Sequence, residues 1–92
     1  MHFILNGGSI HSREALHQAL AAGLHLPEWY GGNLDALHDC LSQPGVENTL
    51  VIRSGAALEA ALGGYAAAFR RVLADCAAEN PQFSVVWEED TP

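Results

Sequence analysis

The chain has 92 residues, with eleven Asp and Glu against four Arg and no Lys, and its formal net charge is −7 at pH 7. Nucleic-acid binders and proteins that adhere to anionic lipid need a basic footprint, so this balance excludes both classes. The absence of Lys also excludes Schiff-base chemistry and a phosphate-binding loop that relies on lysine. Because acidic surfaces steer basic molecules, the expected partner is a basic protein.

The length is suited to one domain, and the hydrophobic content of 49% is sufficient for one modest core. No apolar run approaches the ~18 residues of a membrane span, and the first eight residues are too polar for a signal peptide. Cys40 and Cys76 form no CxxC pair and are interpreted as reduced core thiols of a cytoplasmic protein, with a disulfide between them left open. We therefore expect residues 1–92 to form a single domain, with a frayed tail over residues 89–92.

Strand-like and helix-like segments alternate along the chain. Ser12 and Asn33 are suitable N-caps, and Gly23 is a suitable helix stop. The expected elements in chain order are a strand over 2–6, a helix from Ser12 to Gly23, an aromatic loop over 25–32, a helix over 34–41, a strand over 49–53, helices over 56–62 and 65–79, and a strand over 83–87. Strands joined by helical crossovers predict an α/β fold, a small three-stranded parallel sheet with helices packed on it, in the order β-α-α-β-α-α-β.

The second expected helix is acidic on one side. Its three leucines form an apolar stripe, while Asp35 and Asp39 lie one turn apart on the opposite face, flanked by His38. Like charges at this spacing destabilise a helix by a few tenths of a kcal/mol, and no Lys or Arg in the helix relieves them. A solvated face would explain the pattern, but a cation-free helix after Trp29-Tyr30 and two glycines is more typical of a protein-binding surface.

Catalytic and metal-binding interpretations of the same residues are weaker. Asp35 and His38 have the spacing of a helical metal pair, but a di-metal site needs a second such pair, which the sequence lacks. Acid–base catalysis by Asp35, His38 and Asp39 would need a cleft and a third orienting group. We therefore expect no enzyme activity, no metal and no cofactor, and a small metal-dependent hydrolase is the remote alternative.

Residues 26–41, Leu-Pro-Glu-Trp-Tyr-Gly-Gly-Asn-Leu-Asp-Ala-Leu-His-Asp-Cys-Leu, resemble the barstar family of intracellular inhibitors of secreted, barnase-type bacterial ribonucleases. The family pattern is Leu-Pro-x-aromatic-Tyr-Gly-x-Asn-Leu-Asp-Ala-Leu-x-Asp. The resemblance covers nearly the whole chain, although residues 42–64 are much less characteristic. It implies a three-stranded parallel sheet with packed helices and a protein that plugs a ribonuclease active site.

The resemblance also implies a role for each residue of the contact surface. The acid matching Asp39 lies in the phosphate-binding pocket of the enzyme, and the acid matching Asp35 pairs with further basic groups. The aromatic residue matching Trp29 packs on the catalytic histidine, and alignment of the last helix places a further acid at Asp75. The implied partner-binding residues are Trp29, Tyr30, Gly31, Asn33, Asp35, His38, Asp39 and Asp75.

Two positions depart from the family pattern. Trp29 replaces the more usual Tyr, and His38 stands where the prototype has Trp. His38 reduces the apolar contact and adds a titratable group, so binding is expected to change below about pH 6.5 in a direction set by the neighbouring charge. The expected partner is a basic, barnase-type ribonuclease, bound by a monomeric inhibitor as a 1:1 heterodimer. An acidic binding or immunity module for a different basic protein or toxin is the alternative.

Overall fold

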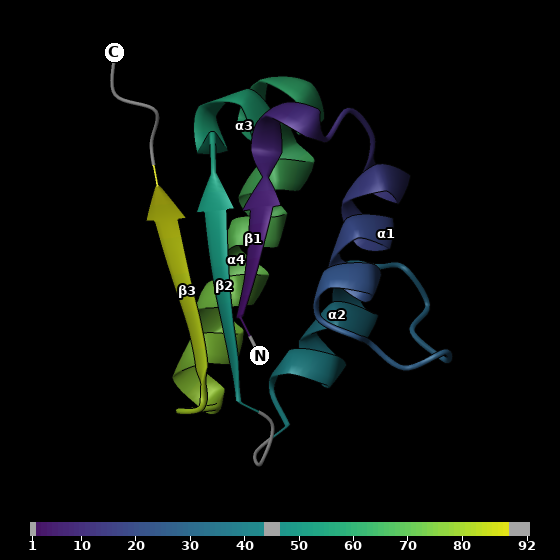
Figure 1. Cartoon of the computed structure of the whole chain (residues 1–92), viewed down its shortest axis with the longest axis vertical. Helices are drawn as coiled ribbons and strands as arrows, with labels where there is room; N and C mark the ends of the chain where they lie inside the picture. Colours follow the sequence, from purple (N-terminus) through teal and green to yellow (C-terminus); the bar gives the residue numbers. More distant parts are fainter. Residues whose placement is uncertain (1, 44–46, 89–92) are drawn as a thin grey trace.

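The computed structural model describes residues 2–43 and 47–88 (Figure 1). The elements of these residues are β1 His2–Asn6, the 3-10 turn η1 Gly7–Ser9, α1 Arg13–Gly23, α2 Leu34–Leu41, β2 Asn48–Arg53, α3 Gly55–Leu62, α4 Gly64–Glu79 and β3 Phe83–Glu88. The strands pair in parallel in the order β1-β2-β3. The predicted fold class and element order are confirmed, and each expected strand or helix boundary lies within one residue of the observed one. The expected tail over 89–92 lies outside the described residues.

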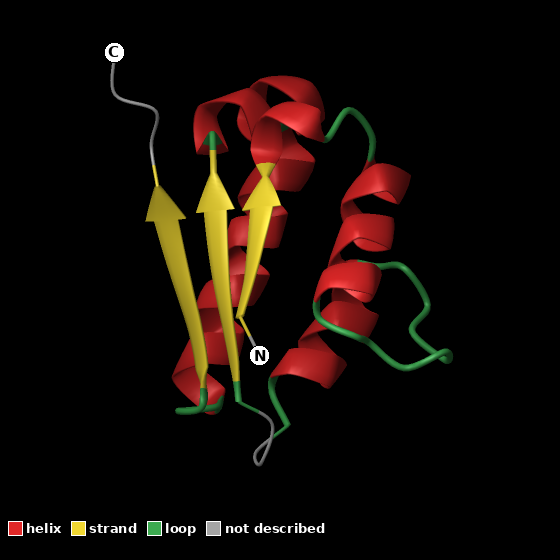
Figure 2. Cartoon of the chain, viewed as in Figure 1, coloured by secondary structure: helices red, strands yellow, loops and turns green. Residues whose placement is uncertain are grey.

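The described helices pack against one face of the sheet. Figures 1 and 2 show α4 crossing behind the three strands, with α1 and α2 beside β1. Because side chains alternate along a strand, two registered rows face the helices, Phe3–Leu50–Val85 and Leu5–Ile52–Trp87. On the opposite face Ile4 and Val86 remain about half exposed. The sheet therefore buries the two rows next to the helices, while Ile4 and Val86 at the edges of its other face are accessible to solvent.

Local sequence signals determine the helix ends. The Ser12 side chain accepts a hydrogen bond from the Ala15 N–H at 3.0 Å, and Asn33 Oδ1 accepts one from the Ala36 N–H at 2.8 Å. Both predicted N-caps are thus confirmed. Gly63 has φ of 59°, in the left-handed region, so α3 and α4 meet at a residue for which glycine is favoured.

Both cysteines are free thiols, which confirms that they are unpaired. Cys76 is fully buried in the core, as predicted, but Cys40 is only partly buried. Cys40 instead lines a cavity of about 170 Å³ next to Trp29, because it lies at the edge of the leucine stripe of α2. Across the described ranges, none of the helices has the length and apolar character required to cross a membrane.

Candidate protein-binding surface

The loop between α1 and α2 holds Trp29 away from the core. The Tyr30 N–H donates to the Pro27 carbonyl at 2.9 Å, which closes a turn around the tryptophan. Trp29 is 65% exposed, an unusual state for so large an apolar side chain. Gly32 follows with φ of 69°, a conformation that favours glycine and directs the chain into α2. The structure therefore presents Trp29 to solvent immediately before the acidic helix.

Tyr30, the next aromatic residue, turns inward and anchors this loop. Its hydroxyl contacts Nδ1 of the buried His17, while Nε2 of the same ring lies 2.6 Å from the Tyr65 hydroxyl on α4. Burial lowers the pKa of His17 and raises the pKa of Tyr30. A neutral imidazole has one donor and one acceptor, so it can satisfy both hydroxyls and connect α1, the loop and α4. Sequence reasoning missed this network, and a contact of Tyr30 with a partner stays a prediction.

The helix α2 places its two carboxylates on the exposed side. Leu37 and Leu41 are buried in the core, whereas Asp35 and Asp39 are exposed, with 73% of the Asp39 side chain accessible. The predicted opposition of the acidic and apolar faces is therefore confirmed. Gly31 and Asn33 are also exposed, directly before the first turn of the helix. The exposed residues of this segment, Trp29, Gly31, Asn33, Asp35 and Asp39, therefore lie within eleven consecutive positions of the chain.

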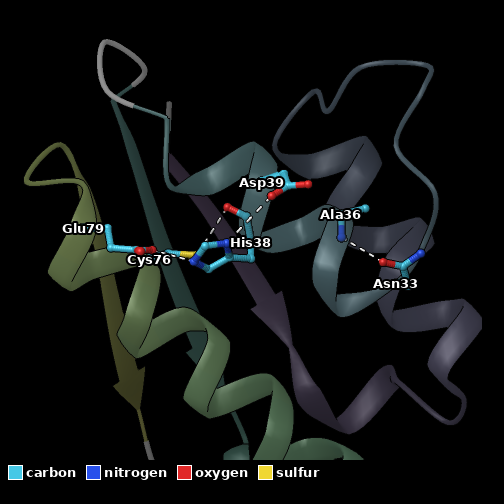
Figure 3. A network of polar contacts seen from close by, with 6 residues as sticks. All are labelled: Asn33, Ala36, His38, Asp39, Cys76 and Glu79. Atoms are coloured by element: carbon cyan, nitrogen blue, oxygen red, sulfur yellow. Dashed lines mark hydrogen bonds and ion pairs between the residues drawn. The ribbon is translucent and has the colours of Figure 1, made fainter.

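The helix α4 adds carboxylates next to α2. His38 Nε2 lies 2.5 Å from Glu79 Oε2, and His38 Nδ1 lies 3.9 Å from Asp39 Oδ1, as Figure 3 shows. The Cys76 thiol donates to the His38 carbonyl at 3.8 Å, which joins the two helices at this point. Asp75 is exposed on α4, one turn before Glu79. His38 is thus held between a carboxylate of its own helix and one of α4.

Sequence reasoning named Asp75 but missed Glu79. The two residues are four apart on a helix, a spacing that places both on the same side. The sequence contains this spacing, but it does not indicate that Glu79 contacts His38. That information comes from the packing of α2 on α4, which joins residues 41 positions apart.

Three arginine side chains form contacts in other parts of the fold. Arg13 and Arg70 lie over the rings of Tyr65 and Trp87, each 4.4 Å from the ring centroid. Arg53 Nε lies 3.5 Å from a carboxylate oxygen of Glu88, on the neighbouring strand. Three of the four arginines of the chain therefore contact groups outside α2, and the carboxylates of that helix keep their negative field.

Asn80 fixes the C-terminal end of α2. Its side chain is 1% exposed, and its Nδ2 group donates to the carbonyls of Leu41 and Gln43, each at 3.1 Å. Its Oδ1 accepts from the Gln82 N–H at 3.0 Å. These bonds tie the last turn of α2 to the connection between α4 and β3, so the exposed carboxylates stand on a fixed scaffold.

Among residues 2–43 and 47–88, no three His, Cys, Asp or Glu side chains gather closely enough to hold a metal ion. The pair Asp35 and His38 is therefore not joined by a third such group among the described residues.

Fold and surface together define a small α/β protein that exposes the carboxylates of a short helix and an aromatic side chain next to it. A model of the family described as Barstar (barnase inhibitor) matches residues 1–88. The chain is also 33% identical, over 87 residues, to a Bacillus subtilis (strain 168) protein named "Putative ribonuclease inhibitor YrdF", covering 92% of this chain and 96% of that protein. The chain belongs to the Barstar (barnase inhibitor) family, which confirms the resemblance seen in the sequence. Members of this family are inhibitors rather than enzymes, so the role of the chain is barnase-inhibitor-like.

Proposed function

We propose that this chain inhibits a barnase-type bacterial ribonuclease in the cytoplasm by inserting α2 and the preceding loop into the active site of the enzyme. The observation that carries the proposal is the pair of exposed carboxylates, Asp35 and Asp39, on a rigid helix next to the exposed Trp29. A ribonuclease site binds a phosphodiester backbone with basic residues. Two carboxylates one helical turn apart can occupy the places of adjacent phosphates and exclude the substrate.

The energetics favour such a contact when the charges are well paired. Burying a carboxylate is unfavourable unless an opposite charge and hydrogen bonds compensate for the lost water. The basic pocket of a ribonuclease supplies that compensation for Asp39. Because α2 is already ordered by the Asn33 cap and by Asn80, little conformational freedom is lost on binding. Complementary charge would also accelerate association between inhibitor and enzyme.

The other exposed residues complete the proposed surface. Trp29 offers a large rigid ring, the type of side chain that dominates the energy of many protein interfaces. Gly31 and Asn33 bring the backbone close to the enzyme, and Asp75 adds negative charge from α4. We propose that inhibitor and enzyme form a 1:1 complex, with occlusion of the site as the whole mechanism.

The test compares the inhibition of purified barnase by the wild-type chain, Asp39→Ala and Glu59→Ala. In the Asp39→Ala complex, the basic groups of the enzyme would be buried without their negatively charged partner. The expected loss of binding free energy is at least about 2 kcal/mol, which is roughly a 30-fold increase in the inhibition constant. Glu59 lies on α3 and pairs with Arg70 at 3.6 Å, so Glu59→Ala should stay within about twofold of the wild type. Hydrolysis of a fluorogenic RNA substrate provides the measurement. Equal losses for the two variants, or no inhibition by the wild type, would refute the proposal.

A further inference from the structure

His38 occupies a position where two helices bring carboxylates together. Its side chain is 34% exposed, with Nε2 2.5 Å from Glu79 and Nδ1 3.9 Å from Asp39. Both ring nitrogens therefore point toward acidic oxygens, from α4 on one side and from α2 on the other (Figure 3). When protonated, the ring forms ion pairs with both groups, and when neutral it leaves their charge uncompensated.

Both acidic and basic residues occur on the elements around His38. The titratable and charged groups on the described elements around it are Asp35, Asp39 and Cys40 on α2; Tyr65, Arg70, Arg71, Asp75, Cys76 and Glu79 on α4; and Glu47 in the segment after α2. Arg70 lies over the ring of Trp87, 4.4 Å from its centroid. The Cys76 thiol stays neutral, because burial raises its pKa to about 12, with further contributions from Glu79 and Asp75. Arg71 is eight residues before Glu79, about 12 Å away along the helix axis. The charges nearest to His38 are therefore carboxylates.

A basic partner competes with the His38 proton for these carboxylates. On the proposed function, on which this inference rests, cations of the partner approach Asp39 and the neighbouring end of α4. A protonated imidazole already occupies Asp39 and Glu79, and it also repels an incoming Arg or Lys. We infer that capture of a basic partner expels the proton from His38, so that affinity rises with pH across the range in which histidine titrates. The structure thereby supplies the direction that the sequence left open.

The inference also extends the contact surface and describes the group that meets it. The carboxylate of Glu79 is bonded to the His38 ring. When that ring is neutral, the negative charge of Glu79 is not compensated by it and is available to a cation of the partner. A partner side chain that carries a positive charge is favoured at the junction of α2 and α4. His38 is thus a specificity-determining residue of the proposed interface.

The experiment measures the affinity of the full chain for purified barnase by calorimetry between pH 5.5 and 8.0, at constant ionic strength. Each proton expelled on binding changes the affinity by up to about tenfold per pH unit, so the wild type should bind several-fold more weakly at pH 5.5 than at pH 8.0. His38→Gln should lose this component of the pH dependence. The matched control His11→Gln removes an exposed histidine located before α1, and it should keep the wild-type dependence. Titrations in buffers of different ionisation enthalpy report the number of protons released.

A second variant tests Glu79 without removing the histidine. Glu79→Gln should weaken binding at pH 8.0, where Glu79 of the wild type can meet a cation of the partner. Thermal unfolding of each variant confirms that it is folded. An identical pH dependence in the wild type and His38→Gln overturns the inference and leaves the proposed function standing, as does wild-type affinity for Glu79→Gln at pH 8.0. Absence of binding by the wild type at every pH overturns the proposed function itself.

Discussion

Asn80 offers a direct test of how the acidic helix is held in place. The substitution Asn80→Ala removes three hydrogen bonds of a side chain that is 1% exposed, two to the carbonyls of Leu41 and Gln43 and one from the Gln82 N–H. Each such bond contributes about 0.5–1.5 kcal/mol net, and buried groups left without a partner cost more. We therefore expect a decrease of about 2–4 kcal/mol in the free energy of unfolding, a large share of the 5–15 kcal/mol typical of a domain.

Urea unfolding followed by circular dichroism gives the free energies, and barnase inhibition gives the functional consequence. Asn80→Asp keeps the acceptor for the Gln82 N–H but sets a carboxylate oxygen against two carbonyls, so it should destabilise at least as much as Asn80→Ala. Gln43→Ala is the matched control, because its side chain is exposed and only its carbonyl accepts the bond. A loss below about 0.5 kcal/mol for Asn80→Ala would show that the end of α2 is fixed by other contacts.

Two further predictions concern Trp29 in the loop before α2 and the buried His17. Trp29→Ala should weaken barnase binding by about 30-fold or more. It should change the free energy of unfolding by less than about 0.5 kcal/mol, because Trp29 is 65% exposed. Calorimetry measures the binding and urea unfolding measures the stability, and a large loss of stability in this variant would contradict the prediction. His17 is buried with a lowered pKa, so the unfolded chain takes up its proton first as pH falls below about 6.5, and stability must fall with it. Urea unfolding at pH 7 and pH 5 should show a smaller decrease for His17→Gln than for the wild type, and an equal decrease would contradict the assignment.

The element boundaries were predictable because local chemistry determines them. Ser12 and Asn33 cap their helices with side chains that reach only three residues ahead. Gly63 permits a left-handed backbone where α3 ends, and this signal too is contained in a few neighbouring residues. The exposed carboxylates of α2 followed from helical periodicity alone, since the buried leucines determine which face points outward. In each case the information lies within one or two helical turns of the residue concerned.

The contacts of the histidines depend on the tertiary fold and could not be predicted in the same way. His17 bonds to tyrosines 13 and 48 positions away, and His38 bonds to Glu79 across 41 positions. Nothing in the local pattern distinguishes His17, which is buried, from His11, which is exposed. The tertiary packing of α1, α2 and α4 brings these partners together. The contact of His38 with Glu79 was unpredictable for the same reason, because Glu79 lies on another helix.

The acidic helix is also a case in which the groups that carry the proposed function contribute little to folding. An eight-residue helix with two like charges one turn apart is not stable by itself. The helix is ordered by contacts on its other face and at its two ends. Leu37 is buried in the core, Asn33 caps the N-terminus, and Asn80 bonds to the carbonyl of Leu41 at the C-terminus. Substitutions on the exposed face therefore change the charge and shape offered to a partner without loosening the scaffold.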